Sequence, residues 1–526
     1  MIATFSDDNN RGICSKCNQI APAHHEVREN KVILIKDCTD CGSTETVVST
    51  DAKRYLEKRE MMEYGGDNVR SCGLNCTTCN AHRLPSLVFI DITNRCNMNC
   101  PICLANIPAM GFRFDPPMAY FDKIFKRLSE FENKPKIQLF GGEPTVRKDL
   151  IDIINLAKDK YGLQARVVTN GLRLADEEYC KGLVQTGTQF MYSFDGRHES
   201  IYETTRKNVK AYERKLKGLE NLAKFGKSKV TVMYCASPLN APYLADMIEY
   251  CHEKRKLISA LDMIPLTADW GPDDVDAESC TIEDVEQMAK NSIPGIEFFP
   301  AGLLPQLKTL CETFPAGRIT FGGAHPNCES VSLLISDGEK YSPPARFLKT
   351  PMDDAIRDAL AMDAAMTKKF EGRSLSESKR RLLYGLQLRK FLKKHVNFRE
   401  VFGGSPSIGI MKIVLGQRSG KKIKTLLRKH TRLKSILRIT ILPLEERECV
   451  EAARLVDCPA SFAYEHPETK EIRFMPVCSW SVYKNEILRA SSEFHGIDDG
   501  TGTLGMGLVN NQPEEDEEHV TSGDEI

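Results

Sequence analysis

The chain has 526 residues, which is more than one ordinary hydrophobic core organises and predicts two or three domains. Its 72 lysines and arginines balance its 72 aspartates and glutamates, so net charge gives no indication of nucleic-acid binding. The start, MIATFSDDNN, lacks the features of a signal peptide, and no run of about 18 apolar residues occurs. We therefore expect a cytoplasmic protein in a reducing compartment. Most of its 19 cysteines sit in close pairs and triplets, which is typical of metal sites rather than of disulfides.

Two CxxC pairs near the start predict a small metal-binding domain. Cys14 and Cys17 form the first pair, and Cys38 and Cys41 form the second. The stretch KVILIK between them alternates as one strand of a hairpin does. Four thiolates held this way suit tetrahedral zinc or a single iron, and the spacing does not choose between a structural zinc and an iron.

From Ser86 onward, short apolar segments alternate with helical segments. The β-rich segments are LVFIDIT, KIQLFG, ARVVTNG, FMYSFDG, KVTVMY and ALDMIPL, and helical segments such as YFDKIFKRLSEF and LIDIINLAKDKY lie between them. This alternation predicts a parallel sheet, open or partly closed into a barrel. In such sheets the chemistry gathers at the carboxyl ends of the strands.

A CxxxCxxC motif occurs twice, and its surroundings distinguish the two copies. Three thiolates can hold a four-iron, four-sulfur cluster and leave one iron open to a small molecule. Cys96, Cys100 and Cys103 follow the first predicted strand directly, whereas Cys72, Cys76 and Cys79 follow no strand. We therefore expect the second copy to be the catalytic one.

Polar residues end the next strands at the same predicted rim. LFGGEPT supplies Gly141 and Gly142, which permit close backbone approach, and Glu143, whose carboxylate could meet an ammonium. Two later strand ends add further candidates, which are Thr169, Asn170, Ser193 and Asp195.

In this order, CNMNCPIC, GGEPT, TNG and SFDG resemble the radical S-adenosylmethionine (SAM) superfamily over roughly 87–266. The resemblance implies an α/β fold with a partial (β/α)6 barrel. It implies that Cys96, Cys100 and Cys103 hold a [4Fe-4S] cluster whose open iron binds SAM, and that Gly141, Gly142 and Glu143 meet the methionine amino group. Ser193 and Asp195 would then lie near the ribose, and a low-potential donor such as ferredoxin or flavodoxin would supply the electron.

The remaining cysteines divide into candidate ligands and isolated residues. Cys72, Cys76 and Cys79 are expected to hold an auxiliary cluster, and Cys328, Cys458 and Cys478, each beside a proline in turn-like sequence, a second one. Cys311 and Cys449 are further candidates. We expect isolated cysteines to be ordinary apolar residues, namely Cys180, Cys235, Cys251 and Cys280. His24 and His25 are interpreted as ordinary surface residues.

The whole layout is similar to the archaeal tetraether lipid synthase group, which carries a rubredoxin-like site and auxiliary clusters. That resemblance implies a C–C bond-forming or C–H functionalising enzyme that couples or modifies alkyl chains of membrane lipids. The alternatives are methylation of a pterin-like cofactor, maturation of a peptide, and, from a different class, a noncatalytic iron–sulfur electron-transfer protein. Nucleic acid is not an expected partner.

Five segments follow from these patterns. They are a four-cysteine metal domain (1–60), an auxiliary-cluster segment (61–85), the radical SAM core (86–300), a cysteine-containing α+β C-terminal domain (301–485) and an acidic, disordered tail (486–526). Two basic helical stretches, ESKRRLLYGLQLRKFLKKH and SGKKIKTLLRKHTRLKSILR, have either solvated faces or a surface for anionic lipid headgroups, which would place the protein peripherally at the membrane.

Overall fold

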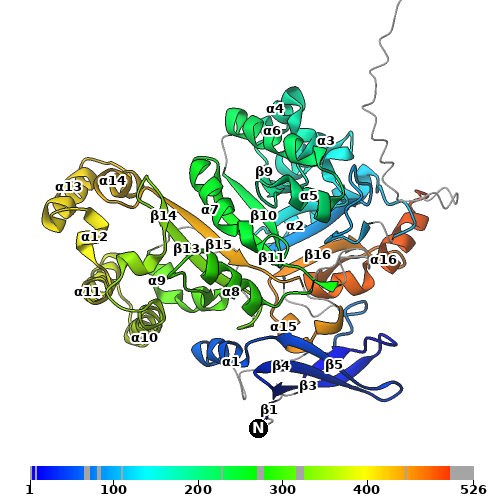
Figure 1. The fold of residues 1–526 in the computed structure, drawn as a ribbon, viewed down its shortest axis with the longest axis horizontal. Coiled ribbons are helices and arrows are strands. Elements are labelled where there is room, and N and C mark those ends of the chain that lie inside the picture. Colours follow the sequence, from blue (N-terminus) through cyan, green and yellow to red (C-terminus); the bar gives the residue numbers. More distant parts are fainter. Residues whose placement is uncertain are drawn as a thin grey trace, which may run out of the picture.

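The computed structural model describes residues 3–5, 9–63, 72–79, 84–107, 110–226, 229–268, 278–314, 325–444 and 447–497. Two sheets organise these residues, a small N-terminal one and a large one that spans the rest (Figure 1). The expected acidic tail from 498 onward lies outside the described residues.

The N-terminal sheet is antiparallel. Its strands are β1 (Ala3–Phe5), β2 (Arg11–Ile13), β3 (Ile20–Arg28), β4 (Lys31–Cys38) and β5 (Gly42–Ser49), and helix α1 (Ala52–Met61) follows. Strand β4 pairs with both β3 and β5. Glu29 and Asn30 both have positive φ at the β3–β4 turn, which is what a two-residue type I′ hairpin requires. The predicted hairpin is therefore confirmed as part of a larger sheet.

The large sheet contains all six predicted parallel strands in sequential order. They are β6 (Leu87–Thr93), β7 (Lys136–Gly141), β8 (Gln164–Thr169), β9 (Gln189–Ser193), β10 (Val230–Ala236) and β11 (Ile258–Pro265). The intervening helices are α2 (Met118–Ser129), α3 (Leu150–Asn155), α4 (Glu177–Gln185), α5 (Glu199–Arg206), α6 (Lys210–Phe225) and α7 (Leu244–Glu253), and α8 (Ile282–Ser292) follows β11. The near-continuous apolar strands are buried, as a sheet covered by helices requires.

Strands from beyond residue 300 extend this sheet at both edges. On one side, β15 (Ser435–Ile441) pairs in parallel with β11 and antiparallel with β13 (Ser330–Ser336). On the other side, β16 (Ala460–Glu465) pairs in parallel with β6 and antiparallel with β17 (Ile472–Pro476). Two short strands, β12 (Phe299–Pro300) and β14 (Tyr341–Ser342), pair with β13. The expected C-terminal domain thus shares the sheet of the core.

Several helices between these strands project from one end of the molecule (Figure 1). They are α9 (Lys308–Thr313), α10 (Met352–Phe370), α11 (Glu377–His395), α12 (Phe398–Phe402), α13 (Pro406–Arg418) and α14 (Ile423–His430). The second basic stretch is helical only to His430, because SILRITI forms strand β15. No helix among the described residues is long and apolar enough to cross a membrane.

The last helix, α16 (Val477–Phe494), fixes the C-terminal region against the first barrel strand; a short α15 (Ala452–Leu455) precedes β16. Trp480 donates its indole N–H to the buried carboxylate of Asp91 on β6 at 2.8 Å and stacks on Phe462 of β16 at 5.0 Å. Burial raises the pKa of Asp91. Helix α16 continues past residue 485, where the tail was expected to begin.

Gly171, after strand β8, tests how tightly the core is packed. Its φ is +84°, and a Cβ there would lie 2.1 Å from Cζ of the buried Tyr192, whereas Gly187, at φ +80°, has nothing within 4 Å. Gly187→Ala should cost about 1–2 kcal/mol from backbone strain alone. Gly171→Ala should cost at least about 2 kcal/mol more, because the Tyr192 ring must also move. Chemical denaturation of both variants measures the difference, and equal losses would contradict it.

Candidate active site and metal centres

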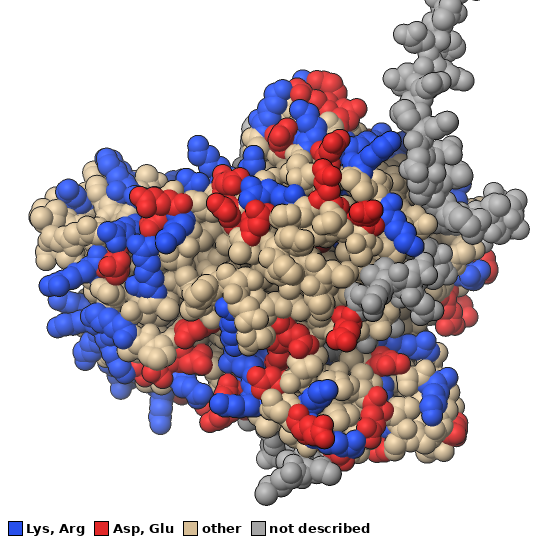
Figure 2. All heavy atoms as spheres, viewed as in Figure 1, with Lys and Arg blue, Asp and Glu red and all other residues tan. Residues whose placement is uncertain are grey.

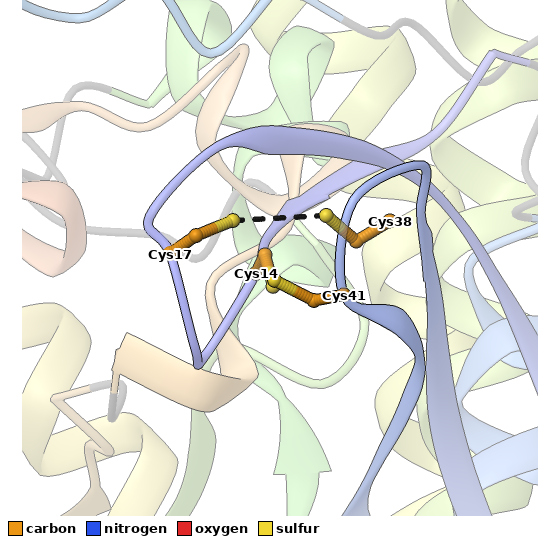
Figure 3. A group of neighbouring side chains, drawn as sticks. All are labelled: Cys14, Cys17, Cys38 and Cys41. Carbon is orange, nitrogen blue, oxygen red and sulfur yellow. Dashed lines mark hydrogen bonds between the residues drawn. The ribbon is translucent and has the colours of Figure 1, made fainter.

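The four N-terminal cysteines converge in space. Their sulfur atoms all lie within 4.8 Å of one another, and Figure 3 shows them pointing toward one centre from the β2–β3 and β4–β5 turns. Sγ of Cys17 and Sγ of Cys38 are 3.7 Å apart. A tetrahedron of sulfurs about 2.3 Å from a metal has edges of about 3.8 Å. The geometry therefore fits one tetrahedral ion, as the sequence predicts.

The backbone around this centre favours the thiolate form of Cys14. Backbone N–H groups of Cys17 and Lys16 lower the pKa of Cys14 to about 6. Amide donors aimed at a ligand sulfur stabilise its charged form, which is the form that binds metal.

The second triad lies in the loop after β6, and the β7 turn supports that loop. The N–H groups of Gly142 and Glu143 donate to the carbonyls of Thr93 and Arg95, each at 2.8 Å. A Cβ at Gly141 would lie 2.1 Å from the Thr93 carbonyl oxygen. Because they lack a side chain, Gly141 and Gly142 allow the turn after β7 to pack directly against the backbone that leads into Cys96.

The Glu143 carboxylate joins the ends of β7 and β8. Its Oε1 accepts from the backbone N–H and hydroxyl of Thr145 at 3.0 and 2.6 Å and from the Thr169 hydroxyl at 2.7 Å. Its Oε2 accepts from the Asn170 N–H at 2.6 Å. Glu143 is 1% exposed. Oε2 of Glu143 can therefore accept a further hydrogen bond at a position buried from solvent.

Asn170 connects this group to the cysteine loop. Its side-chain amide donates to the Asn97 side chain at 2.8 Å and lies 3.9 Å from the sulfur of Cys96. Burial, and secondarily the charge of Glu143, raise the pKa of Cys96. The structure thus brings Cys96, Glu143, Thr169 and Asn170 together, as the sequence predicts.

Asp195, at the end of β9, is the second buried carboxylate of the rim. It is 1% exposed, and its Oδ2 accepts from Arg206 at 2.6 and 3.0 Å. Its Oδ1 accepts from the N–H of Cys235 on β10 at 3.0 Å. Arg206 also donates to the carbonyl of Ile102, between Cys100 and Cys103, at 2.9 Å. The ion pair therefore holds the cysteine loop against β9 and β10.

Lys215 completes the electrostatics beneath the loop. This buried ammonium donates to the carbonyls of Asn170 and Ser193 at 2.7 and 2.8 Å. Burial, with Arg206 nearby, lowers the pKa of Lys215 to about 8. Burial raises the pKa of Cys100, and the charges of Arg206 and Lys215 oppose that rise. The Cys100 thiol therefore lies beside two buried cations, which fits a loop that holds an anionic iron–sulfur cluster.

Arg206 and Lys215 were not identified from the sequence. The sequence does contain a signal for Lys215, because this residue interrupts the apolar stripe of Ala211 and Leu219 at helical spacing. In the structure Lys215 is 1% exposed. Arg206, at the end of α5, carries no comparable pattern.

The first triad lies beside the start of α16. Burial raises the pKa of Cys76 to about 11, and the nearby side chain of Ser479 opposes that rise. Cys72 packs in the same apolar cluster as Cys478, which is the second residue of α16. The structure therefore brings Cys478 toward the first triad, to which the sequence had not assigned it.

The other cysteines and histidines differ in their surroundings. The sulfur of Cys458 lies 3.4 Å from the Ala460 carbonyl. Cys180 and Cys251 are buried, whereas Cys235 and Cys280 are partly exposed and Cys311 is exposed. The interpretation of His25 as a surface residue is wrong: it is fully buried, with its ring 3.3 Å from the carboxylate of Glu451. Its burial follows the alternation of Ala21, Ala23 and His25 along β3.

Comparison with known proteins agrees with this architecture. Residues 90–251 match the family model of the Radical SAM superfamily, and residues 8–50 match the HMPTM N-terminal zinc ribbon domain. The chain therefore contains a radical SAM domain after an N-terminal zinc ribbon, and it is an enzyme of the type that uses a [4Fe-4S] cluster and SAM. An interpretation as a noncatalytic electron carrier is wrong.

The chain is also similar to individual named proteins. The chain is 29% identical over 354 residues to the 7,8-dihydro-6-hydroxymethylpterin dimethyltransferase of Methanocaldococcus jannaschii, covering 64% of this chain and 70% of that protein. It is 29% identical over 198 residues to the Fe-coproporphyrin III synthase of Methanosarcina barkeri, covering 37% and 48%. The solved structure of native anSMEcpe with bound AdoMet and Cp18Cys peptide matches at 20% identity with a TM-score of only 0.34, covering 39% of this chain and 58% of that one. These names do not refer to a tetraether lipid synthase.

The zinc-ribbon site predicts a specific change in metal content. Cys17→Ser should lose one zinc or iron ion per chain, because a tetrahedral site closed by four thiolates does not tolerate the loss of one. Its iron–sulfur absorbance should remain. The control is Cys180→Ala, which changes a buried cysteine that is expected to be an ordinary apolar residue, and elemental analysis compares the two variants. Retention of the ion in Cys17→Ser would contradict the site.

The Asp195–Arg206 pair predicts a loss of stability. Asp195→Asn removes the carboxylate that pairs with the buried Arg206 guanidinium, so the free energy of unfolding should fall by about 3–5 kcal/mol. The matched control is Asp246→Asn, which breaks the more exposed pair with Arg197 at 2.5 Å and should cost about 1 kcal/mol or less. Urea denaturation of the reconstituted proteins compares the two, and similar losses would contradict a structural role for the buried pair.

Proposed function

We propose that this enzyme transfers carbon to an unactivated position of a pterin-like heterocycle, in the manner of a radical SAM methyltransferase. The observation that carries the proposal is the presence, in one chain, of the radical SAM domain and the HMPTM-type zinc ribbon. The likeness to a pterin dimethyltransferase over 64% of the chain supports the same substrate class. The substrate expected first, a membrane lipid, has less support than this alternative.

We assign the residues of the rim to the cofactors as follows. Cys96, Cys100 and Cys103 would ligate the catalytic cluster. Glu143 would accept a hydrogen bond from the methionine ammonium through Oε2, which has one protein donor in the described contacts. Ser193 and Asp195 would lie toward the ribose. When bound, the cluster and SAM together supply a 5′-deoxyadenosyl radical.

The protein itself would position the reacting groups and exclude water from the site. Glu143, Thr169 and Asp195 are each at most 2% exposed, so the polar groups at the strand ends are held by protein donors rather than water. Groups locked by several hydrogen bonds keep a reacting carbon aligned and exclude competing hydrogen donors. Arg206 and Lys215 would balance the cluster's negative charge and thereby adjust its potential.

We also propose that Cys72, Cys76 and Cys79 hold an auxiliary cluster, with Cys478 as its fourth ligand. The shared apolar cluster of Cys72 and Cys478 and the Ser479 hydroxyl beside Cys76 support this assignment. Cys328 and Cys458 remain candidates for another site. A low-potential donor such as ferredoxin or flavodoxin would reduce the clusters.

Coupling or modification of lipid alkyl chains is the second candidate. The observation that favours it is the group of exposed apolar side chains on α13, which include Met411 and Leu415. An enzyme that takes lipid substrates needs such a contact with the bilayer.

The products distinguish the two candidates. The anaerobically reconstituted chain is incubated with methyl-labelled SAM, a low-potential reductant and either 7,8-dihydro-6-hydroxymethylpterin or a lipid extract. We expect the pterin to gain labelled methyl groups, detected by mass spectrometry, with release of 5′-deoxyadenosine. Cys100→Ala should abolish the product, and Cys180→Ala, at a buried cysteine expected to be an ordinary apolar residue, should not.

A lipid that loses hydrogens while the pterin mass stays unchanged would support the second candidate instead. Formation of 5′-deoxyadenosine with neither product would remove both substrate assignments.

A further inference from the structure

The lobe formed by α12, α13 and α14 (398–434, the basic lobe) concentrates positive charge in a chain that has no net charge. It contains ten lysines and arginines and one acidic residue, Glu400. Glu400 pairs with Arg432 at 3.0 Å. Partial desolvation and then the charges of Lys429 and Lys412 lower the pKa of His430. Figure 2 shows lysine and arginine gathered over this end of the molecule around uncharged surface.

Helix α13 adds apolar side chains to this charged surface. Ile408, Met411 and Leu415 follow one another at helical spacing and are 51%, 54% and 55% exposed. Ile410 and Val414 are also exposed, so α13 is apolar on several sides while lying at the surface. A helix of that composition is ordinarily buried in protein or in a membrane.

A cleft of about 450 Å³ lies beside Ile408 of α13. It is lined by charged and apolar groups, including Phe402, Ile408, Lys412, Lys429, Arg432 and Lys434. The lining is mainly polar and cationic, with Phe402 and Ile408 as its large apolar side chains. Its cations match the chemistry of a phosphorylated headgroup, and the exposed side chains of α13 match that of the acyl region.

Other macromolecules fit this surface less well. A nucleic acid would meet exposed aliphatic side chains of α13 where its phosphates need cations and its bases need aromatic rings. A second copy of the chain would bring two basic lobes together. An acidic electron-carrier protein needs a position near a metal centre, but the lobe and α16, which carries Cys478, lie at opposite ends of Figure 1.

We propose that the basic lobe docks on an anionic lipid membrane, with α13 lying in the interface. Apolar side chains of α13 enter the boundary between headgroups and acyl chains, and lysines such as Lys421, Lys422 and Lys424 contact the headgroups. This contact does not depend on whether the enzyme's substrate is a pterin or a lipid.

Sedimentation with vesicles tests the proposal on the full-length reconstituted protein. The chain should bind vesicles that contain phosphatidylglycerol and should not bind pure phosphatidylcholine. Lys421→Gln/Lys422→Gln/Lys424→Gln should weaken binding at least about tenfold, since each cation near an anionic surface contributes about fivefold. Met411→Glu/Leu415→Glu should weaken it by at least about tenfold as well, because charged side chains do not enter the interface.

Matched changes elsewhere provide the controls. Lys53→Gln/Lys181→Gln/Lys217→Gln removes three cations that form only exposed, long ion pairs, and Leu56→Glu changes an apolar residue that is 41% exposed. Both should bind vesicles as the unaltered chain does. No binding to anionic vesicles would overturn the proposal. So would unchanged binding by Met411→Glu/Leu415→Glu, which would indicate a purely electrostatic site for a nucleic acid or an acidic protein.

Discussion

Two buried carboxylates hold the rim of the barrel together, and the arrangement of the cysteine loop depends on them. Glu143 accepts four hydrogen bonds from the ends of β7 and β8, while its own N–H donates to Arg95, directly before Cys96. Asp195 links β9 to β10 and, through Arg206, to the carbonyl of Ile102. The loop is therefore fixed at both ends by groups that come from different strands.

Burial strengthens these hydrogen bonds and ion pairs, and it also makes any unpaired carboxylate energetically unfavourable. An isolated carboxylate in a dry site would be strongly unfavourable, so each one must be satisfied by several donors or by a paired cation. Arg206 and Lys215 supply that positive charge next to the thiols. The same groups can thus stabilise the protein before a cluster binds and balance the cluster's charge afterwards. The polar residues of the rim have a structural role whichever substrate is processed.

Local pattern was sufficient for the core and for the zinc ribbon. Buried parallel strands such as LVFIDIT are short apolar runs, and their order along the chain is their order in the sheet. Long-range pairing was not predictable in this way. SILR ended a basic stretch that was interpreted as helical, although it begins strand β15, which pairs with β11. Strand β16 joins β6 from the far end of the chain. Neither segment contains a local sequence pattern that specifies the strand with which it pairs.

That long-range pairing also determines how far the C-terminal half can act by itself. Because β15 and β16 cover the two edges of the core's parallel sheet, they satisfy backbone groups that would otherwise be exposed on β11 and β6. The contact of Trp480 with Asp91 then places the start of α16, and with it Cys478, beside the first cysteine triad. The first triad and the radical SAM core are consequently positioned by the same strand, β6. The basic lobe follows α11 and leads into β15, which β11, β10, β9, β8 and β7 separate from β6 and its cysteine loop.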